Sequence, residues 1–501
     1  MNNGFLKDLL KYLPAQVTPG IVGLVSLPIV ARVFLPSDYG YYNLVTATLA
    51  VLTTLFGWLP TSILRFYPAY ARQARLDVFN ATVIHLGTIA MLALTGLYYV
   101  VLLATRAWLP AKLWYLLTAG GLLFAVTCAF DLLQCTLRSK RFVGHYSAFA
   151  IWQSVAGFSL GITLALVLGF GIAGLLLGPA LSIAAALPLL WTNAMERGTR
   201  IRFRKMDMQA VRATFAYGLP LVLGNLAAWV LGLSDRYILA MFRTSTEVGL
   251  YALSYNIADK SLMLLVTLFM MASGPFSIHV WENSGEKASK EFVTDVTRFY
   301  LLLCVPPVVG LSILSKLVVG VLGGPAYVHG HTIVPFVLLG VLLFGLQQRF
   351  HYGLLFHQKT GPITLAIVIA GVLKVFLNLL FVPRYGYFGA AVTTLACYAV
   401  LLFLLIWFSR YLFVWRFPFR SLLHAVIASG VMGVAIHVVG RLSHLPAAAT
   451  LLLCIGVGMG VYFPVLLALG EFSSQELRDL WLAARRMLAG MQSVGGTAGS
   501  R

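Results

Sequence analysis

The sequence predicts an all-α polytopic membrane protein, with about fourteen transmembrane helices in two homologous six-helix lobes and two additional C-terminal helices. Three observations support this prediction. Hydrophobic residues make up 60% of the 501 residues and charged residues only 10%, whereas a soluble domain has about 45–50% and about 25%. Apolar runs long enough to cross a bilayer recur almost from end to end. Two loop motifs occur twice, at nearly equal offsets. This composition excludes a cytosolic enzyme or a secreted domain.

The individual helices are predicted from runs of about 20 apolar residues, which match the hydrocarbon thickness of a membrane. Proline and glycine interrupt many of the runs, so their bounds are approximate. In chain order the runs are 13–34, 41–64, 79–103, 113–137, 146–168, 172–193, 212–234, 249–275, 293–315, 331–356, 361–382, 386–409, 419–440 and 446–469.

The basic residues predict the orientation of these helices. With the N-terminus in the cytoplasm, 23 of the 36 Lys and Arg lie in inner segments or at the inner ends of runs, 8 lie in outer segments or at outer ends, and 5 lie in or directly beside the runs. Cytoplasmic loops carry the excess of Lys and Arg. We therefore expect a multi-pass protein of the cell (inner) membrane, with both termini cytoplasmic and no cleaved signal peptide. The net charge of +20 then reflects topology and not a nucleic-acid partner.

The domain organisation follows from the runs and the loops between them. We predict an N-terminal lobe at 1–195, a basic cytoplasmic linker at 196–211 and a C-terminal lobe at 212–410. Two extra spans at 411–470 and a cytoplasmic tail at 471–501 complete the chain. Basic residues beside the membrane, densest in the linker, would attract anionic membrane lipids.

An internal duplication is predicted from two pairs of loops. FLPSDYGYYNL at 34–44 aligns with FRTSTEVGLYAL at 242–253, so that Gly40 corresponds to Gly249. FGIAGLLLGPALS at 170–182 aligns with YGYFGAAVTTLAC at 385–397, so that Gly171 corresponds to Gly386. Each repeat contains six runs, an even number, and both therefore insert in the same orientation. Two parallel halves around a central cleft are typical of transporters that work by alternating access.

Other functional classes have weaker support in the sequence. We find no selectivity filter of a channel, no Walker loop and no HExxH motif. His329 and His331 have no further ligands nearby, so no metal or cofactor is expected. We expect that the protein is not an enzyme, although a membrane glycan polymerase or ligase stays an alternative. Such an enzyme would usually have larger extramembrane loops than this chain.

Three short motifs resemble a known family: FLPSDYGYYNL at 34–44, RFYPAY at 65–70 and PRYGYFGAA at 383–391. They are similar to motifs of the bacterial polysaccharide-biosynthesis (Wzx-type) flippases. These belong to the MATE-like (MOP) exporter superfamily, with the lipid II flippase and the multidrug antiporters. The resemblance implies a polyprenyl-diphosphate-linked oligosaccharide as substrate, moved from the cytoplasmic to the outer leaflet. It also implies other polysaccharide-assembly proteins as partners.

Ionisable residues within the membrane are costly and usually face a cavity or a partner. Lys260 and Lys374 lie near the middle of their runs, and Asn378 shares one helix face with Lys374. Because arginine and lysine suit phosphate oxygens, basic residues are the candidates for substrate binding. They are Lys260, Lys374, Arg65, Arg349 and Arg32, with Asn378 beside them. For Lys260 the alternative is a carboxylate partner on another helix, and for Arg65 and Arg32 it is an interfacial position.

Acidic residues within the membrane are fewer, and they are the candidates for ion coupling. Antiport of H⁺ or Na⁺ needs an acid whose affinity differs between two states. We assign this role to Asp259 and Asp131, for which simple ion pairing is the alternative. A multidrug antiporter coupled to Na⁺ or H⁺ stays the second candidate function. An exporter of organic cations would favour an acidic or aromatic cavity, and the surplus of basic residues speaks against it.

Overall fold

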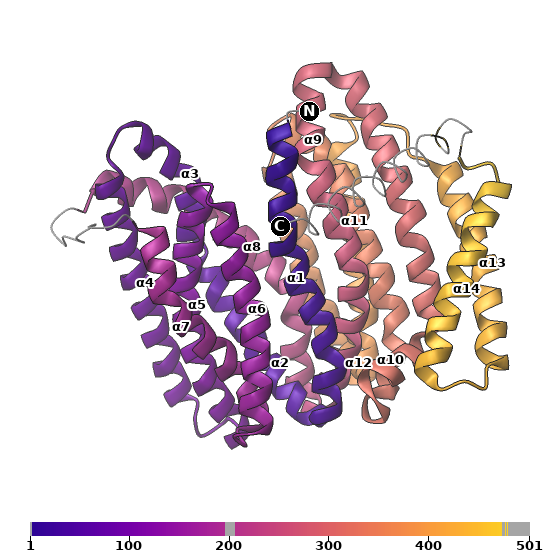
Figure 1. Cartoon of the computed structure of the whole chain (residues 1–501), viewed down its shortest axis with the longest axis horizontal. Coiled ribbons are helices and arrows are strands. Elements are labelled where there is room, and N and C mark those ends of the chain that lie inside the picture. The colour runs from indigo at the N-terminus through magenta and orange to yellow at the C-terminus, as the bar shows by residue number, and fades with distance from the viewer. Residues whose placement is uncertain (1–2, 196–205, 473–475, 477, 479–501) are drawn as a thin grey trace, which may run out of the picture. The chain divides into compact units, whose positions relative to one another are not determined.

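A computed structural model describes residues 3–195, 206–472, 476 and 478 of the chain. Most of these residues lie in α-helices, and no β-strand occurs in the described part. Figure 1 shows the elements, which are α1 (Asn3–Val33), α2 (Pro36–Phe56), α3 (Trp58–Arg72), α4 (Leu76–Ala104), α5 (Ala111–Ser139), α6 (Val143–Leu166), η1 (Gly171–Ala173), α7 (Gly174–Ala194), α8 (Met208–Phe242), α9 (Ser245–Ile313), α10 (Ser315–Gly323), η2 (Pro325–Ile333), α11 (Val334–Phe356), α12 (Gly361–Ser409), α13 (Phe419–Leu442) and α14 (Ala447–Ala468).

The predicted class of fold is confirmed. Among the described residues, 11 helical segments are long and apolar enough to cross a membrane. One of them is α9, which is interrupted at Gly285, and another is α12, which is interrupted at Gly386. The predicted second span consists of two helices, α2 and α3, that meet at Gly57. The total of fourteen spans stays a prediction.

The helices group into two compact units. Unit 1 comprises residues up to 270 together with 318–414, and unit 2 comprises 271–317 and the residues from 415 onward. The second half of α9 therefore belongs with α13 and α14, which lie side by side (Figure 1). The predicted division into two lobes and two extra spans stays a prediction. Of the predicted linker only residues 206–211 are described, and of the predicted tail only 471, 472, 476 and 478.

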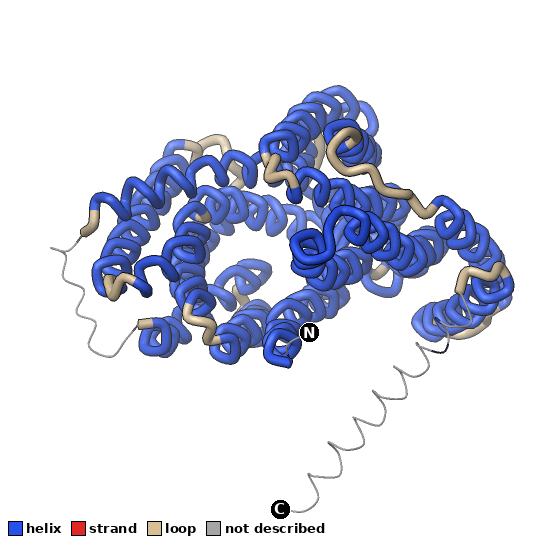
Figure 2. The backbone as a smooth tube through the Cα atoms, turned by 90° about the horizontal axis from the view of Figure 1, so that it is seen from above, coloured by secondary structure: helices blue, strands red, loops and turns tan. Residues whose placement is uncertain are grey.

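Within unit 1 the helices run side by side and are seen nearly end-on in Figure 2. The pairs α6–α7, α11–α12 and α8–α12 have the most extensive packing, and α1 lies along α6. Helices α6 and α7 approach closely because small residues face each other. A side chain on Gly178 would place its Cβ 2.2 Å from the backbone of Gly161. Such small-residue contacts are how helices associate tightly in lipid.

The two predicted sequence repeats have equivalent places in the structure. Gly40 near the start of α2 packs against the start of α9, and its counterpart Gly249 packs against the start of α2. Gly171 and Gly386 have nearly the same left-handed backbone, with φ of 55° and 56°. Glycine adopts positive φ without steric cost. The equivalent positions and conformations support an internal duplication.

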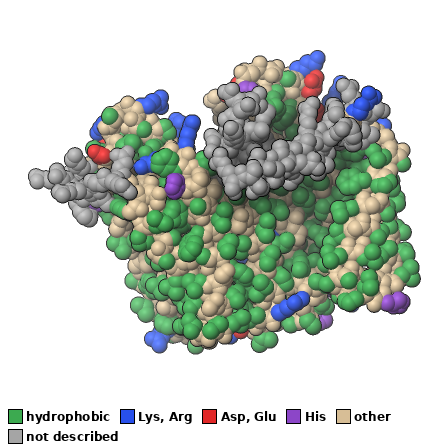
Figure 3. Space-filling view, viewed as in Figure 1, with side chains coloured by type: hydrophobic (Ala, Val, Ile, Leu, Met, Phe, Trp, Pro, Cys, Tyr) green, Lys and Arg blue, Asp and Glu red, His purple; other side chains and the backbone are tan. Residues whose placement is uncertain are grey.

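The surface is that of a multi-pass membrane protein. On the face drawn in Figure 3, hydrophobic side chains cover most of the described surface, and Lys and Arg gather along the upper edge. Helix α4 illustrates this, because Leu92, Leu97 and Leu103 are each more than 60% exposed. Large apolar side chains exposed in such numbers are expected where a protein faces lipid.

Candidate functional site

The candidate site is a cavity of about 770 Å³ within unit 1. Helices α1, α2, α6 and α7 form one part of its wall, and α8 and the first half of α9 form the other. The polar and charged side chains on this wall include Tyr39, Asn43, Gln153, Arg236, Asn256 and Lys260. No Asp or Glu of the described residues lines the cavity. A concave site with a few convergent polar groups is the usual form of a ligand site.

Lys260 lies on the cavity wall and comes from α9. Its Nζ donates a hydrogen bond to the backbone oxygen of Gly23 on α1, at 3.2 Å. A side chain at Gly23 would place its Cβ 2.9 Å from this Nζ, so the ammonium group lies directly against α1 at this glycine. The structure thus puts a residue that we predicted to bind substrate beside a cavity, while the binding itself stays a prediction.

Arg236 is a cavity residue that the sequence analysis missed. It lies beyond residue 234, where the predicted run ends, but α8 continues to Phe242 and Arg236 is only 3% exposed. Its guanidinium lies 5.3 Å from the centre of the Tyr255 ring and 3.5 Å from the Asp235 carboxylate. The sequence does contain a sign of this position. The apolar run that begins at 212 resumes after the charged residues Asp235 and Arg236 and continues to Phe242.

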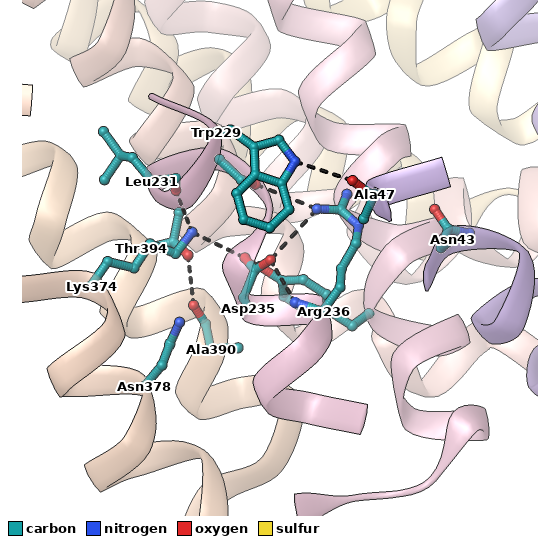
Figure 4. A network of polar contacts seen from close by, with 12 residues as sticks. Asn43, Ala47, Trp229, Leu231, Asp235, Arg236, Lys374, Asn378, Ala390 and Thr394 are labelled. Atoms are coloured by element: carbon teal, nitrogen blue, oxygen red, sulfur yellow. Dashed lines mark hydrogen bonds and ion pairs between the residues drawn. The ribbon is translucent and has the colours of Figure 1, made fainter. Parts of the chain in front are cut away.

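Asp235 connects three helices through a buried network (Figure 4). The Lys374 Nζ, on α12, lies 3.1 Å from the Asp235 carboxylate and 2.6 Å from the backbone oxygen of Leu231. The Tyr251 hydroxyl, on α9, donates to the same carboxylate. Lys374 and Asp235 are fully buried. No acid lies near Lys374 in the sequence, and the acid that it contacts in the structure, Asp235, is 139 positions away.

The other predicted substrate-binding residues lie outside this cavity wall. Asn378 is fully buried and accepts a hydrogen bond from the Thr393 hydroxyl. Arg349 is fully buried in α11, where it donates to the Tyr352 hydroxyl at 3.3 Å. Substrate roles for these residues, and for Lys374, stay predictions.

Arg65 and Arg32 are both exposed. Arg65 lies on α3, and Arg32 at the end of α1 donates to the backbone oxygen of Val321 at 3.3 Å. Neither residue lines the cavity. Their exposure is what an interfacial position would give, and their substrate roles stay predictions.

The two residues predicted to couple ions lie in different places. Asp259 is half-buried in α9 and is close enough to Arg236 and Lys260 for electrostatic interaction. Asp131 on α5 lines a separate pocket of about 430 Å³. Three cations (Arg236, Lys260 and Lys374) thus interact with two acids (Asp235 and Asp259), which leaves a surplus of positive charge; of these five residues only Arg236 and Lys260 line the cavity. The described residues contain no cluster of three His, Cys, Asp or Glu that could hold a metal.

Together, the membrane-spanning helices and the repeated loops define a multi-pass α-helical membrane protein. The chain belongs to the family described as "Polysaccharide biosynthesis protein", which it matches over residues 5–280, more than half its length. Membership in this family confirms the resemblance that the loop motifs indicated.

Solved structures share the fold. The chain is similar to the lipid II flippase MurJ in an inward closed conformation, with a TM-score of 0.74 and 16% identity over 93% of this chain and 98% of that one. It is also similar to an inward-facing multidrug resistance MATE family transporter of the MOP superfamily. There the TM-score is 0.63 and the identity 13%, over 80% of this chain and 97% of that one. At these identities the likeness shows the fold alone.

Two curated relatives match part of the chain. One is MJ1068, an uncharacterised membrane protein of Methanocaldococcus jannaschii, 23% identical over 40% of this chain and 39% of that protein. The other is Agl15 of Haloferax volcanii, described as a probable low-salt glycan biosynthesis flippase. It is 24% identical over 39% of this chain and 42% of that protein. The chain therefore spans about two fifths of the length of these relatives.

Proposed function

We propose that the protein is a flippase for a polyprenyl-diphosphate-linked oligosaccharide in cell-surface polysaccharide biosynthesis. It moves this lipid from the cytoplasmic to the outer leaflet of the cell membrane by alternating access, without catalysing a covalent reaction. The family and the description of Agl15 as a probable glycan biosynthesis flippase support the proposal. Both termini would lie in the cytoplasm.

The observation that carries the proposal is the charge of the cavity wall. Arg236 and Lys260 line it, and no acid of the described residues does. A diphosphate offers oxygens that accept charge-assisted hydrogen bonds from both side chains. Arginine presents several donors in a planar fork, and lysine adds a compact charge. Aromatic residues that could bind a cation are present on this wall (Tyr39, Tyr42, Tyr146 and Phe158), so it is the lack of carboxylates beside two basic residues that speaks against an exporter of organic cations.

The position of the cavity suggests how binding is linked to movement. Arg236 and Lys260 come from α8 and α9, whereas Asn43 and Gln153 come from α2 and α6. A ligand that contacts both sets favours the arrangement in which they approach each other. Differential affinity of this kind is the only way in which a ligand shifts a conformational equilibrium. Asp259, beside both cations, is our candidate for coupling this shift to H⁺ or Na⁺.

The direct test is translocation in proteoliposomes. A polyprenyl diphosphate oligosaccharide with a fluorescent label becomes accessible to an impermeant quencher only when it reaches the outer leaflet. We expect wild-type protein to increase this rate, and Lys260→Ala and Arg236→Ala each to decrease it at least tenfold. Lys359→Ala removes an exposed lysine and serves as the matched control, with the wild-type rate.

Two outcomes would contradict the proposal. Transport of an organic cation such as ethidium, with no movement of the labelled lipid, would establish the multidrug antiporter in its place. Formation of a longer or transferred glycan would instead indicate a polymerase or ligase.

A further inference from the structure

We propose that a second pocket in unit 1 binds the saccharide portion of the substrate. This pocket of about 430 Å³ is lined by Thr53, Thr54, Thr61, Asp131, Gln134, Arg138, Tyr146 and Asn225, among others. The inference rests on the proposed function and adds to it a site for neutral, hydroxyl-rich groups. Tyr146 lines both this saccharide pocket and the basic cavity, so the two are neighbours.

The threonines of the saccharide pocket present acceptors. Thr53 and Thr54 both donate their hydroxyl protons to the backbone oxygen of Ala50, at 3.1 and 2.7 Å. Thr61 donates its proton to the backbone oxygen of Gly57 at 2.8 Å. A hydroxyl has one proton and two lone pairs. With the protons engaged within the helices, these oxygens remain able to accept hydrogen bonds from a ligand.

Gln134 and Asp131 add further acceptors. The Gln134 side-chain nitrogen donates to the backbone oxygen of Tyr146 at 3.4 Å, which fixes the orientation of the amide. Gln134 is 6% exposed, and its side-chain oxygen has no hydrogen-bond partner among the described residues. A buried acceptor without a partner costs free energy. A ligand that donates to this oxygen would remove that cost.

The charges of the saccharide pocket favour a neutral ligand. Asp131 contributes one negative charge and Arg138 one positive charge to the lining. The pocket therefore has no surplus charge to attract an organic cation, and it differs in this respect from the basic cavity. Sugar hydroxyls are neutral and numerous donors, and they match a wall that is rich in acceptors. The two neighbouring sites thus match the two parts of one ligand, a diphosphate and a saccharide.

The experiment measures the contribution of the saccharide to binding separately from that of the diphosphate. We would measure binding to purified full-length protein of a short-chain polyprenyl diphosphate, either bare or carrying one hexose or one N-acetylhexosamine. Wild-type protein should bind at least one glycosylated form more tightly than the bare carrier. Asp131→Asn, Gln134→Leu and Thr54→Val should each reduce that gain about 2- to 10-fold, the effect of one or two hydrogen bonds. Their affinity for the bare carrier should not change.

Controls distinguish this site from the basic cavity. Thr105→Val removes a hydroxyl that donates to its own helix in the same manner, at 2.8 Å, but lies outside the saccharide pocket. This variant should still bind the glycosylated carrier more tightly than the bare carrier, by the same factor as the wild type. Lys260→Ala should weaken binding of bare and glycosylated carriers alike.

Three results would overturn the inference: no gain from either sugar in the wild type, equal losses for bare and glycosylated carriers in the pocket variants, or Asp131-dependent binding of ethidium without sugar binding. If the wild type binds neither carrier, the proposed function itself fails, and that result differs from the three above.

Discussion

Asp235 is the acid that pairs with two buried cations of unit 1, Lys374 and Arg236. Its carboxylate accepts from the Lys374 ammonium and the Tyr251 hydroxyl, and the Arg236 guanidinium lies 3.5 Å away. Lys374 has one other hydrogen bond, to the backbone oxygen of Leu231. Loss of Asp235 therefore leaves the buried Lys374 without an acid and leaves Arg236 with Asp259 alone, whereas loss of Lys374 leaves Asp235 with two partners.

The first prediction is an asymmetry between these two losses. Asp235→Asn should destabilise the protein by about 3–5 kcal/mol, the cost of leaving buried charge unpaired. Lys374→Met should cost less, about 1–3 kcal/mol, because Arg236 and Tyr251 still satisfy Asp235. Thermal unfolding in detergent measures both. Asp77→Asn changes an exposed acid in the first turn of α4 and should cost at most about 1 kcal/mol. Equal losses for the two network variants would show that Arg236 does not stabilise Asp235.

The sequence could reveal part of this site. Lys260 stood out because a charge in the middle of an apolar run usually faces a cavity or a partner. Pairing between Lys374 and Asp235 could not be predicted, because it depends on how α8 and α12 are rotated. Nearly all faces of both helices are apolar, and the sequence pattern therefore does not define their rotation. Arg236 was missed because a predicted helix end was placed too early.

At the scale of elements, α2 and α9 begin at equivalent glycines that approach each other. A Cβ at Gly40 would lie 1.9 Å from the backbone oxygen of Ser245, and one at Gly249 would lie 1.8 Å from that of Pro36. No real Cβ contact is this short, so a side chain at either position must push the two helices apart. In the proposed transport cycle this contact would open and close.

The second prediction concerns this contact. Gly40→Ala and Gly249→Ala should each destabilise the protein by about 1–3 kcal/mol, the usual cost of overpacking. Gly96→Ala is the control, because a Cβ at Gly96 meets nothing within 4 Å. Alanine is the better helix former, and this control should be neutral or about 1 kcal/mol more stable. Thermal melting of the three variants is the measurement. If Gly40→Ala and Gly249→Ala are as stable as Gly96→Ala, the close packing of the two helices is refuted.

In unit 2, Glu471 joins α9 to α13 just after the end of α14. It accepts from Ser421 at 2.6 Å, from Arg298 at 2.8 Å and from His424 at 2.7 Å. Arg298 donates to Glu476 as well, at 2.6 Å. Burial acts to raise the pKa of Glu471, but the hydrogen bonds from these three side chains outweigh it and hold the pKa below its usual range.

The third prediction is the pH dependence that this depressed pKa implies. Stabilisation by Glu471 is complete above the pKa of an unfolded glutamate, about 4.3. It is lost as the pH falls further through the lower folded pKa, because the unfolded state then binds more protons. Melting temperatures between pH 7 and pH 3 should therefore fall less steeply in Glu471→Gln than in the wild type. Glu286→Gln, at an exposed pair with Lys290, should keep the wild-type slope. An unchanged slope in Glu471→Gln would contradict the assignment.

The elements themselves could be predicted well, and their interruptions less so. Each predicted apolar run lies mainly within helices of the structure, because the length of a run and its hydrophobicity suffice to define a span. The break at Gly57 was not predicted, whereas Gly285 lies in the gap predicted between the runs 249–275 and 293–315. Gly285 has φ of 79°, which glycine permits, but its neighbours are polar and read as an ordinary loop. Gly386 was found in advance, because it recurs in the other repeat as Gly171.

At the scale of the whole molecule, the predicted orientation connects the charges to the direction of transport. Helix α4 alone can test it, because its 29 residues extend about 44 Å and so exceed the hydrocarbon core of about 30 Å. Gln73 lies before this helix and Trp108 after it, and both side chains are exposed. If the N-terminus is cytoplasmic, Gln73 lies inside and Trp108 outside.

The last prediction is that single cysteines at these two positions react from opposite sides. Cys128, Cys304, Cys397 and Cys454 are buried, so only the less buried Cys135 needs replacement by serine as background. In intact cells an impermeant maleimide should label Trp108→Cys and not Gln73→Cys, and after lysis it should label both. The reverse pattern would place the positive linker outside, against the excess of basic residues. It would also contradict the cytoplasmic position of both termini that we propose.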